Sequence, residues 1–187
     1  MLKKILKMAI ARFERQNGYD GSYTRYIVEH SPSALWKLGK IQGFATHHED
    51  VPRDAYYAAK ITSVLRADCG PCTQLVVTWA ERAGVAPTTI HAVLTKDWDA
   101  MTYDVQLVVK FIEAALARSL EADVLREEIR QKWGDRAVIT LAYAATAGQI
   151  YPTLKYALGF GHECTLIKVA GKDVRVSHEL PKILQAI

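Results

Sequence analysis

The sequence predicts a mostly helical protein with one small β-hairpin near its C-terminal end. Apolar residues recur at intervals of three and four through most of the chain, as they do on the buried face of a helix. The period changes to two only after residue 161, where alternating residues 165–169 face residues 174–176 across a turn at Ala170-Gly171-Lys172. Many helices with a single hairpin place the chain in the all-α class.

The individual helices follow from the apolar period and from residues typical of helix ends. The expected helices span about residues 2–15, 22–30, 32–44, 55–68, 72–83, 87–94, 103–120, 121–133 and 136–158. Ser31 is expected to cap one of them, with Pro32 at its first helical position. Gly84 is a typical C-terminal stop, and the polar segment 46–54 is expected to be a loop.

Size and charge exclude several classes of protein. A length of 187 residues with 50% hydrophobic and 24% charged residues suits one globular domain. The net charge of +4 comes from interleaved charges, so no nucleic-acid partner is expected. Lys3, Lys4 and Lys7 lie on an amphipathic segment that we interpret as a packing helix, not as a membrane anchor or a signal peptide. No apolar stretch is long enough to span a bilayer, and a cytoplasmic location is expected.

The feature most informative about function is Cys69-Gly70-Pro71-Cys72, which holds two of the three cysteines of the chain. A Gly-Pro turn at a helix start brings the two sulfurs together, and the unpaired N–H groups there favour a thiolate. Redox chemistry through a reversible disulfide is therefore the first functional hypothesis. Only three cysteines also fit a reducing compartment with one reactive pair.

The context of this motif resembles the alkylhydroperoxidase D-like and carboxymuconolactone decarboxylase superfamily. The resemblance rests on a helix before the thiols, the segment from Cys69 to Leu75, the stretch Ala80-Glu81-Arg82-Ala83-Gly84-Val85 and the short helix that follows. It covers about residues 50–160, which leaves residues 1–49 as an N-terminal helical extension and residues 161–187 as a C-terminal tail with the hairpin.

The resemblance implies an all-helical, homo-oligomeric thiol oxidoreductase that needs no cofactor or metal. It would reduce a small peroxide or exchange disulfides with a lipoyl-type dithiol or a protein disulfide. In the redox branch of the family, a Glu twelve positions before the first Cys and a His four positions after the second relay protons. Here these positions hold Tyr57 and Val76, neither of which can relay a proton at neutral pH.

Three residues could support the thiols in place of that relay, namely Asp68, Tyr57 and His91. The choice of nucleophile is open, because electrostatics at the helix start favours Cys69 whereas the resemblance favours Cys72. We adopt Cys72 as the nucleophile and Cys69 as the resolving thiol.

Three other interpretations compete with this one. The chain could be a non-catalytic helical oligomeric module that keeps the fold and not the activity. It could hold zinc through Cys69, Cys72, His162 and Cys164, although His162 and Cys164 make a poor chelating pair and Cys164 suits a buried structural role. It could be thioredoxin-like, but a thioredoxin motif follows a β-strand, whereas a helix is expected before Cys69.

Overall fold

The computed structural model describes residues 2–162 and 165–179. Over these residues the chain is mostly helical with a two-stranded antiparallel sheet, which confirms the predicted class. No helix in this part of the chain combines the length and the apolar character that crossing a bilayer requires. Whether the helices follow the specific fold of the resembled family stays a prediction.

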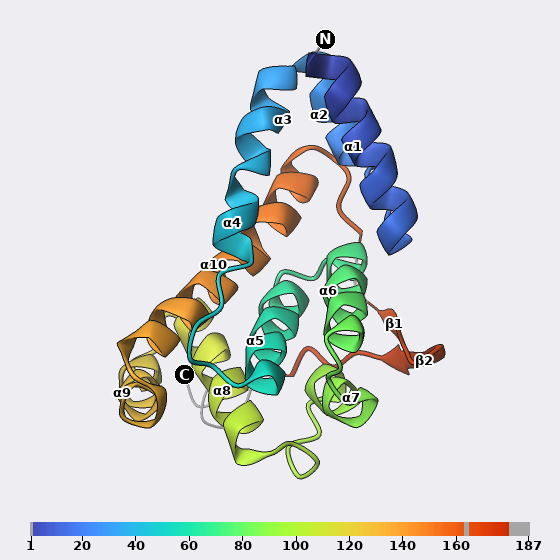
Figure 1. Ribbon diagram of the computed structural model, residues 1–187. Coiled ribbons are helices and arrows are strands. Elements are labelled where there is room, and N and C mark those ends of the chain that lie inside the picture. Colours follow the sequence, from blue (N-terminus) through green and yellow to red (C-terminus); the bar gives the residue numbers. More distant parts are fainter. Residues whose placement is uncertain (1, 163–164, 180–187) are drawn as a thin grey trace.

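The first four helices form an N-terminal arm, defined here as residues 2–45. They are α1 (Leu2–Asn17), α2 (Ser22–His30), α3 (Pro32–Gly39) and α4 (Ile41–Ala45). The Ser31 side chain accepts a hydrogen bond from a backbone N–H in the first turn of α3, as predicted for a cap. The helix expected over 32–44 divides in two near Lys40, which ends α3 and begins α4. Figure 1 shows α1, α2 and α3 side by side at one end of the molecule.

The remaining helices form the helical core. They are α5 (Arg53–Arg66), α6 (Gly70–Arg82), α7 (Pro87–Thr95), α8 (Tyr103–Ala117), α9 (Glu121–Trp133) and α10 (Asp135–Ala157). Helix α5 lies at the centre and contributes to two apolar clusters, one shared with α6, α7 and the hairpin and the other with α8, α9 and α10. The core therefore depends on α5, most of which is buried.

Helix α10 approaches α5 closely because small residues face one another. A Cβ built on Gly148 would lie 2.3 Å from Ser63 Oγ, which leaves no room for a larger residue. The Ser63 hydroxyl donates a hydrogen bond to the Ala145 carbonyl at 2.6 Å, and Gln149 Nε2 donates to the Ser63 carbonyl at 2.6 Å. This crossing fixes the end of α10 that reaches toward the arm (Figure 1).

The hairpin joins β1 (Leu166–Val169) and β2 (Lys172–Arg175), as predicted. Ala170 and Gly171 both have positive φ, which matches the twist of a two-residue hairpin turn. Ile167, Val169 and Val174 are buried against the thiol-bearing side of the core. The hairpin is therefore part of the apolar cluster that surrounds the cysteines.

The arm is attached to the core through the end of α1. Trp79 Nε1 of α6 donates a hydrogen bond to Asn17 Oδ1 at 3.0 Å, and Arg82 donates to the Gln16 carbonyl at 2.6 Å. Arginine at the last carbonyls of a helix satisfies acceptors that the helix itself leaves open. Two side chains of the last turn of α6 thus hold the end of α1 against the core.

Candidate functional site

The two thiols lie at the start of α6. Cys69 is the N-cap residue, with φ −115° and ψ 97°, and Pro71 follows within the first turn. Cys72 then lies one turn into the helix, where its Sγ is 2.8 Å from Cys69 Sγ. The side chain of Cys69 is fully buried, and Cys72 is 5% exposed. The predicted proximity of the sulfurs is present in the structure, and both cysteines are free thiols.

The hydrogen bond between the thiols separates their acidities. It lowers the pKa of Cys69 to about 7 against the opposing effect of burial, and the Lys155 ammonium and the backbone N–H of Cys72 lower it further. The same hydrogen bond and burial raise the pKa of Cys72. Cys69 is therefore the thiol that ionises more readily, and the negative charge of the ionised pair lies on its sulfur.

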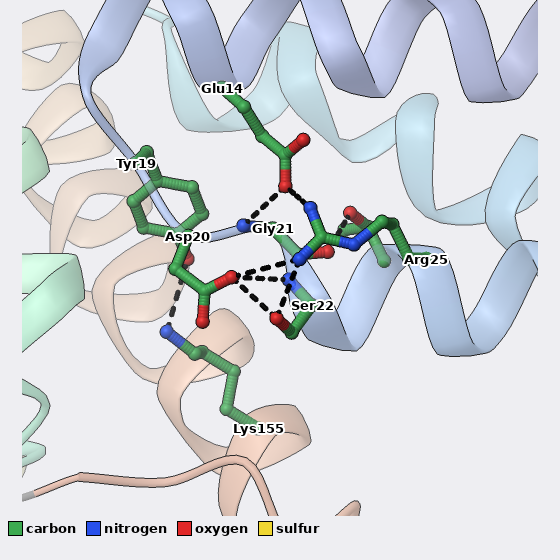
Figure 2. Close-up of polar contacts among 8 residues, drawn as sticks. Glu14, Tyr19, Asp20, Gly21, Ser22, Arg25 and Lys155 are labelled. Carbon is green, nitrogen blue, oxygen red and sulfur yellow. Dashed lines mark hydrogen bonds and ion pairs between the residues drawn. The ribbon is translucent and has the colours of Figure 1, made fainter.

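A buried lysine from the far end of the chain lies beside this charge. Lys155 of α10 is 3% exposed, and its Nζ donates a hydrogen bond to the Tyr19 hydroxyl at 3.2 Å (Figure 2). Its ammonium also lies over the Tyr19 and Tyr23 rings, 5.0 and 5.4 Å from their centres. Tyr19 and Cys72 line the same cavity. Lys155, Tyr19 and the thiols are therefore polar groups gathered in an otherwise apolar region.

The loop that carries Tyr19 is held by a polar network. Figure 2 shows Glu14, Asp20 and Arg25 gathered around the chain at Gly21. Glu14 Oε1 accepts from the Gly21 N–H at 2.9 Å and pairs with Arg25, while Asp20 Oδ1 accepts from Arg25 at 3.2 Å. A Cβ on Gly21 would lie 2.7 Å from Glu14 Oε1, so a larger residue there would displace the Glu14 carboxylate from this network. This network orients the Tyr19 hydroxyl toward α10.

A cavity of about 210 Å³ separates the arm from the core, and Cys72 forms part of its wall. Most of the lining is apolar. Its walls include Phe13 and Leu35 from the arm and Val76 and Trp79 from the core. Val76, at the position of the family's histidine, is thus an apolar wall residue. Cys69 is not among the lining residues, so a molecule in the cavity would meet Cys72 first.

Lys60 of α5 lines the same cavity and is 8% exposed. Its Nζ donates to the Ala45 carbonyl at 3.1 Å and to the Tyr56 hydroxyl at 3.4 Å. It also lies 5.1, 5.9 and 5.4 Å from the ring centres of Tyr56, Tyr57 and Trp79. Burial lowers the pKa of Lys60 to about 8, which leaves the amine mostly protonated at pH 7.

Asp68, predicted as a supporting residue, adjoins Cys69 but acts against its ionisation. Its negative charge raises the pKa of Cys69. Its carboxylate lies 3.7 Å from His178 Nε2, and its carbonyl accepts a hydrogen bond from the Tyr156 hydroxyl at 2.8 Å. These contacts connect the turn before α6 to α10 and to the tail that follows β2.

The other two predicted supporting residues lie apart from the thiols. Tyr57, at the position of the family's glutamate, packs edge-on against Tyr56 and near Lys60, and it lines a shallow surface hollow rather than the cavity. His91 is exposed on α7 and is not among the lining residues of the cavity. The structure therefore does not bring Tyr57 or His91 to the sulfurs.

The zinc interpretation is tested only in part, because Cys164 lies outside the described residues. His162 lies next to the thiol helix through its backbone, since its carbonyl accepts a hydrogen bond from the Gly70 N–H at 3.1 Å. Within residues 2–162 and 165–179, no three His, Cys, Asp or Glu side chains are grouped so that they could hold a metal ion.

Sequence reasoning missed Tyr19, Lys60 and Lys155. One signal was available, because both lysines interrupt otherwise apolar helix faces. Lys155 falls on the face that includes Ala144, Ala147 and Gly148, and Lys60 follows Tyr56 by four residues on a buried face. A lysine is rarely buried at such a position unless its charge is paired.

Comparisons of the chain with family models, with curated proteins and with solved structures gave no match.

Proposed function

We propose that this chain is a thiol-dependent oxidoreductase of the alkylhydroperoxidase D-like type, which cycles Cys69 and Cys72 between dithiol and disulfide. One observation carries the proposal. The sulfurs are 2.8 Å apart, and only one of them, Cys72, borders an apolar cavity. A substrate in the cavity contacts Cys72 first, and Cys69, which does not line the cavity, then forms the disulfide with Cys72.

The reaction follows from this arrangement. When the proton of the pair moves to Cys69, the Cys72 thiolate attacks a peroxide oxygen, so an S–O bond forms as the O–O bond breaks and an alcohol leaves. Cys69 then loses its proton and attacks the Cys72 sulfenic acid, which forms the S–S bond and releases water. The thiols supply two electrons, and an external dithiol restores them by exchange.

Burial favours a small peroxide over a protein disulfide as the oxidising substrate. Cys69 is fully buried and Cys72 is 5% exposed beneath the N-terminal arm, so a folded partner cannot bring its disulfide to either sulfur without displacing that arm. The reductant is in turn expected to be a slender dithiol, such as a lipoyl group, rather than a protein surface.

Tyr19 and Lys155 take the place of the missing relay. The Lys155 ammonium favours a negative charge on Cys69 and donates a hydrogen bond to the Tyr19 hydroxyl, and Tyr19 lines the cavity together with Cys72. A proton can therefore reach the leaving alkoxide through a hydroxyl rather than through an imidazole. Burial raises the pKa of Tyr19, so this hydroxyl stays protonated at neutral pH.

The test is consumption of an organic hydroperoxide by the reduced protein with an excess of dithiol. Wild type and Cys164→Ser are expected to turn over alike, because Cys164 has no part in the proposed reaction. Cys72→Ser is expected to abolish consumption, and Cys69→Ser, assayed without dithiol, is expected to consume one equivalent per chain and to stop at a Cys72 sulfenic acid that dimedone traps. Equal background rates for wild type and Cys72→Ser would contradict the proposal and favour the non-catalytic helical module.

A further inference from the structure

Lys60 carries a buried charge that residues 2–162 and 165–179 do not neutralise. Among the described residues, no carboxylate lies within 4.0 Å of its Nζ. Its hydrogen-bond partners are one carbonyl and one phenol, which leave one of its three N–H donors without a protein acceptor. Lysine is almost never buried in this way without a counter-charge.

Lys60 lies between the cavity and the surface of the molecule. Lys60, Gln42 and Trp79 line both the cavity beside Cys72 and the shallow hollow on the surface. Lys60 therefore stands at the boundary between the enclosed space and the outside. Among the described residues that line the cavity it is the one cationic side chain, and none of the others is acidic.

We propose that the cavity binds a small apolar monocarboxylate, with the carboxylate on the Lys60 ammonium and the apolar part between the arm and the core. The carboxylate would use the remaining Lys60 donor and the neighbouring Gln42 amide. The apolar part would lie against side chains such as Leu35, Val64 and Val76. This binding site goes beyond the proposed redox function and does not require the thiols to turn over.

The dimensions of the cavity limit the ligand. A buried apolar cavity of about 150 Å³ holds a benzene ring, and this cavity measures about 210 Å³. A chain of roughly six to eight carbons therefore fits, with its charged end at the boundary. A long-chain lipid would leave much of its length outside.

The aromatic rings around Lys60 stabilise the cation without replacing the anion. Each ring of Tyr56, Tyr57 and Trp79 attracts the ammonium, but the rings leave its hydrogen-bonding capacity unused. If residue 60 served only to support the fold, a neutral side chain packed against these rings would do so equally well. A carboxylate supplies the acceptor that the rings lack.

The experiment measures affinity with octanoate and with octanamide, which have the same chain length and differ in charge. Titration calorimetry on the reduced full-length protein gives the dissociation constants, and the change in tryptophan fluorescence, to which Trp79 in the cavity wall contributes, follows occupation of the cavity. The variants are Lys60→Met, which keeps a long unbranched side chain, and Lys37→Met, which removes an exposed lysine from α3 of the arm.

Wild type and Lys37→Met are expected to prefer octanoate over octanamide by about tenfold or more, as one charge-assisted hydrogen bond supplies. Lys60→Met should lose this preference and still bind octanamide, which would show that the variant keeps its cavity. The inference is overturned if wild type binds the two probes equally, if it binds neither, or if Lys60→Met retains the preference. Because no peroxide is present, failure of the redox proposal would leave this result unaffected.

Discussion

Two buried lysines, Lys96 and Lys60, differ in whether a carboxylate neutralises their charge. Lys96, which ends α7, is 7% exposed, and Lys60 is 8% exposed. Lys96 Nζ lies 2.5 Å from Glu113 Oε1, and Arg66 approaches the other oxygen of this carboxylate at 3.9 Å. Among the described residues, Lys60 Nζ contacts a carbonyl, a phenol and aromatic rings, and no carboxylate.

The difference between the two lysines indicates which charge stabilises the fold. A buried ion pair is neutral as a unit, so Lys96 and Glu113 can join α7 to α8 under all conditions in which both are ionised. Burying an ammonium without a counter-charge instead costs folding free energy, and a bound anion would lower this cost. The pair is therefore expected to act in stability, and Lys60 in binding.

The largest effect is expected from breaking the ion pair. Glu113→Gln leaves the buried Lys96 ammonium without its counter-charge, which should lower the free energy of unfolding by about 3–5 kcal/mol. Urea denaturation measures this loss. The matched control is Glu127→Gln, which removes an exposed partner of Arg130 and should change stability by less than about 1 kcal/mol. Similar values for the two variants would mean that the buried pair contributes no more than a surface pair.

The opposite sign is expected at Lys60. Its pKa falls from 10.5 to about 8 on folding, so the folded state holds the proton less well than the unfolded state. At 1.36 kcal/mol per unit, Lys60→Met should raise the free energy of unfolding at pH 7 by up to about 3 kcal/mol. A loss of stability in this variant would contradict the interpretation of Lys60 as an uncompensated charge.

The lowered pKa of Lys60 also makes the free energy of unfolding depend on pH. Below pH 8 both states are protonated at Lys60, and between pH 8 and 10.5 the folded state releases the proton first. The stability of wild type should therefore rise over this interval through Lys60, relative to Lys60→Met measured at the same pH values. If the two curves run parallel, the pKa of Lys60 is unperturbed.

An intermediate effect is expected at the thiols, because the strongest influence on Cys69 is a neutral donor. Cys72→Ala removes the hydrogen bond that lowers the pKa of Cys69 and should raise that pKa by about 1–2 units, whereas Cys72→Ser keeps a donor and should raise it less. The ultraviolet absorbance of the thiolate against pH, in a Cys164→Ser background, reports the value. Identical titrations of the two variants would exclude the hydrogen bond as the cause.

The smallest effect is expected from Lys155, the third buried lysine. Its charge is a secondary influence on Cys69, so Lys155→Met should raise the pKa of that thiol by about half a unit to one unit. The same absorbance titration measures this change. A shift as large as that of Cys72→Ala would make Lys155, and not the neighbouring thiol, the main stabiliser of the thiolate.

The fold could be predicted from the sequence where local signals decide it. The Ser31 cap, the hairpin turn and the proximity of the two thiols each depend on residues within a few positions of one another. The helix expected over 103–120 ends earlier, at Ala117, because Arg118 adopts a left-handed conformation. Leu120, expected on the buried face, is consequently 85% exposed.

The surroundings of the thiols could not be predicted because they come from distant parts of the chain. Lys155 and Tyr19 are separated from each other by 136 residues and meet only because α10 crosses α5 at Gly148. Counting from the cysteines finds Val76, an apolar residue one turn along α6 from Cys72, and Tyr57, which does not line the cavity. A packing contact between two helices, rather than a motif, decides which residues surround the sulfurs.

The hairpin bears on whether two molecules of this protein can pair through their strands. A two-stranded sheet leaves backbone donors and acceptors along its outer edge, where a strand of another molecule can pair. At Lys168 both groups are already used, because the Gln74 side chain accepts from its N–H at 2.7 Å and donates to its carbonyl at 3.0 Å. Glu81 accepts from the next exposed N–H, at Ala170, at 2.6 Å. Side chains of the thiol helix thus occupy the outer edge of β1 and block the pairing of another strand along that edge.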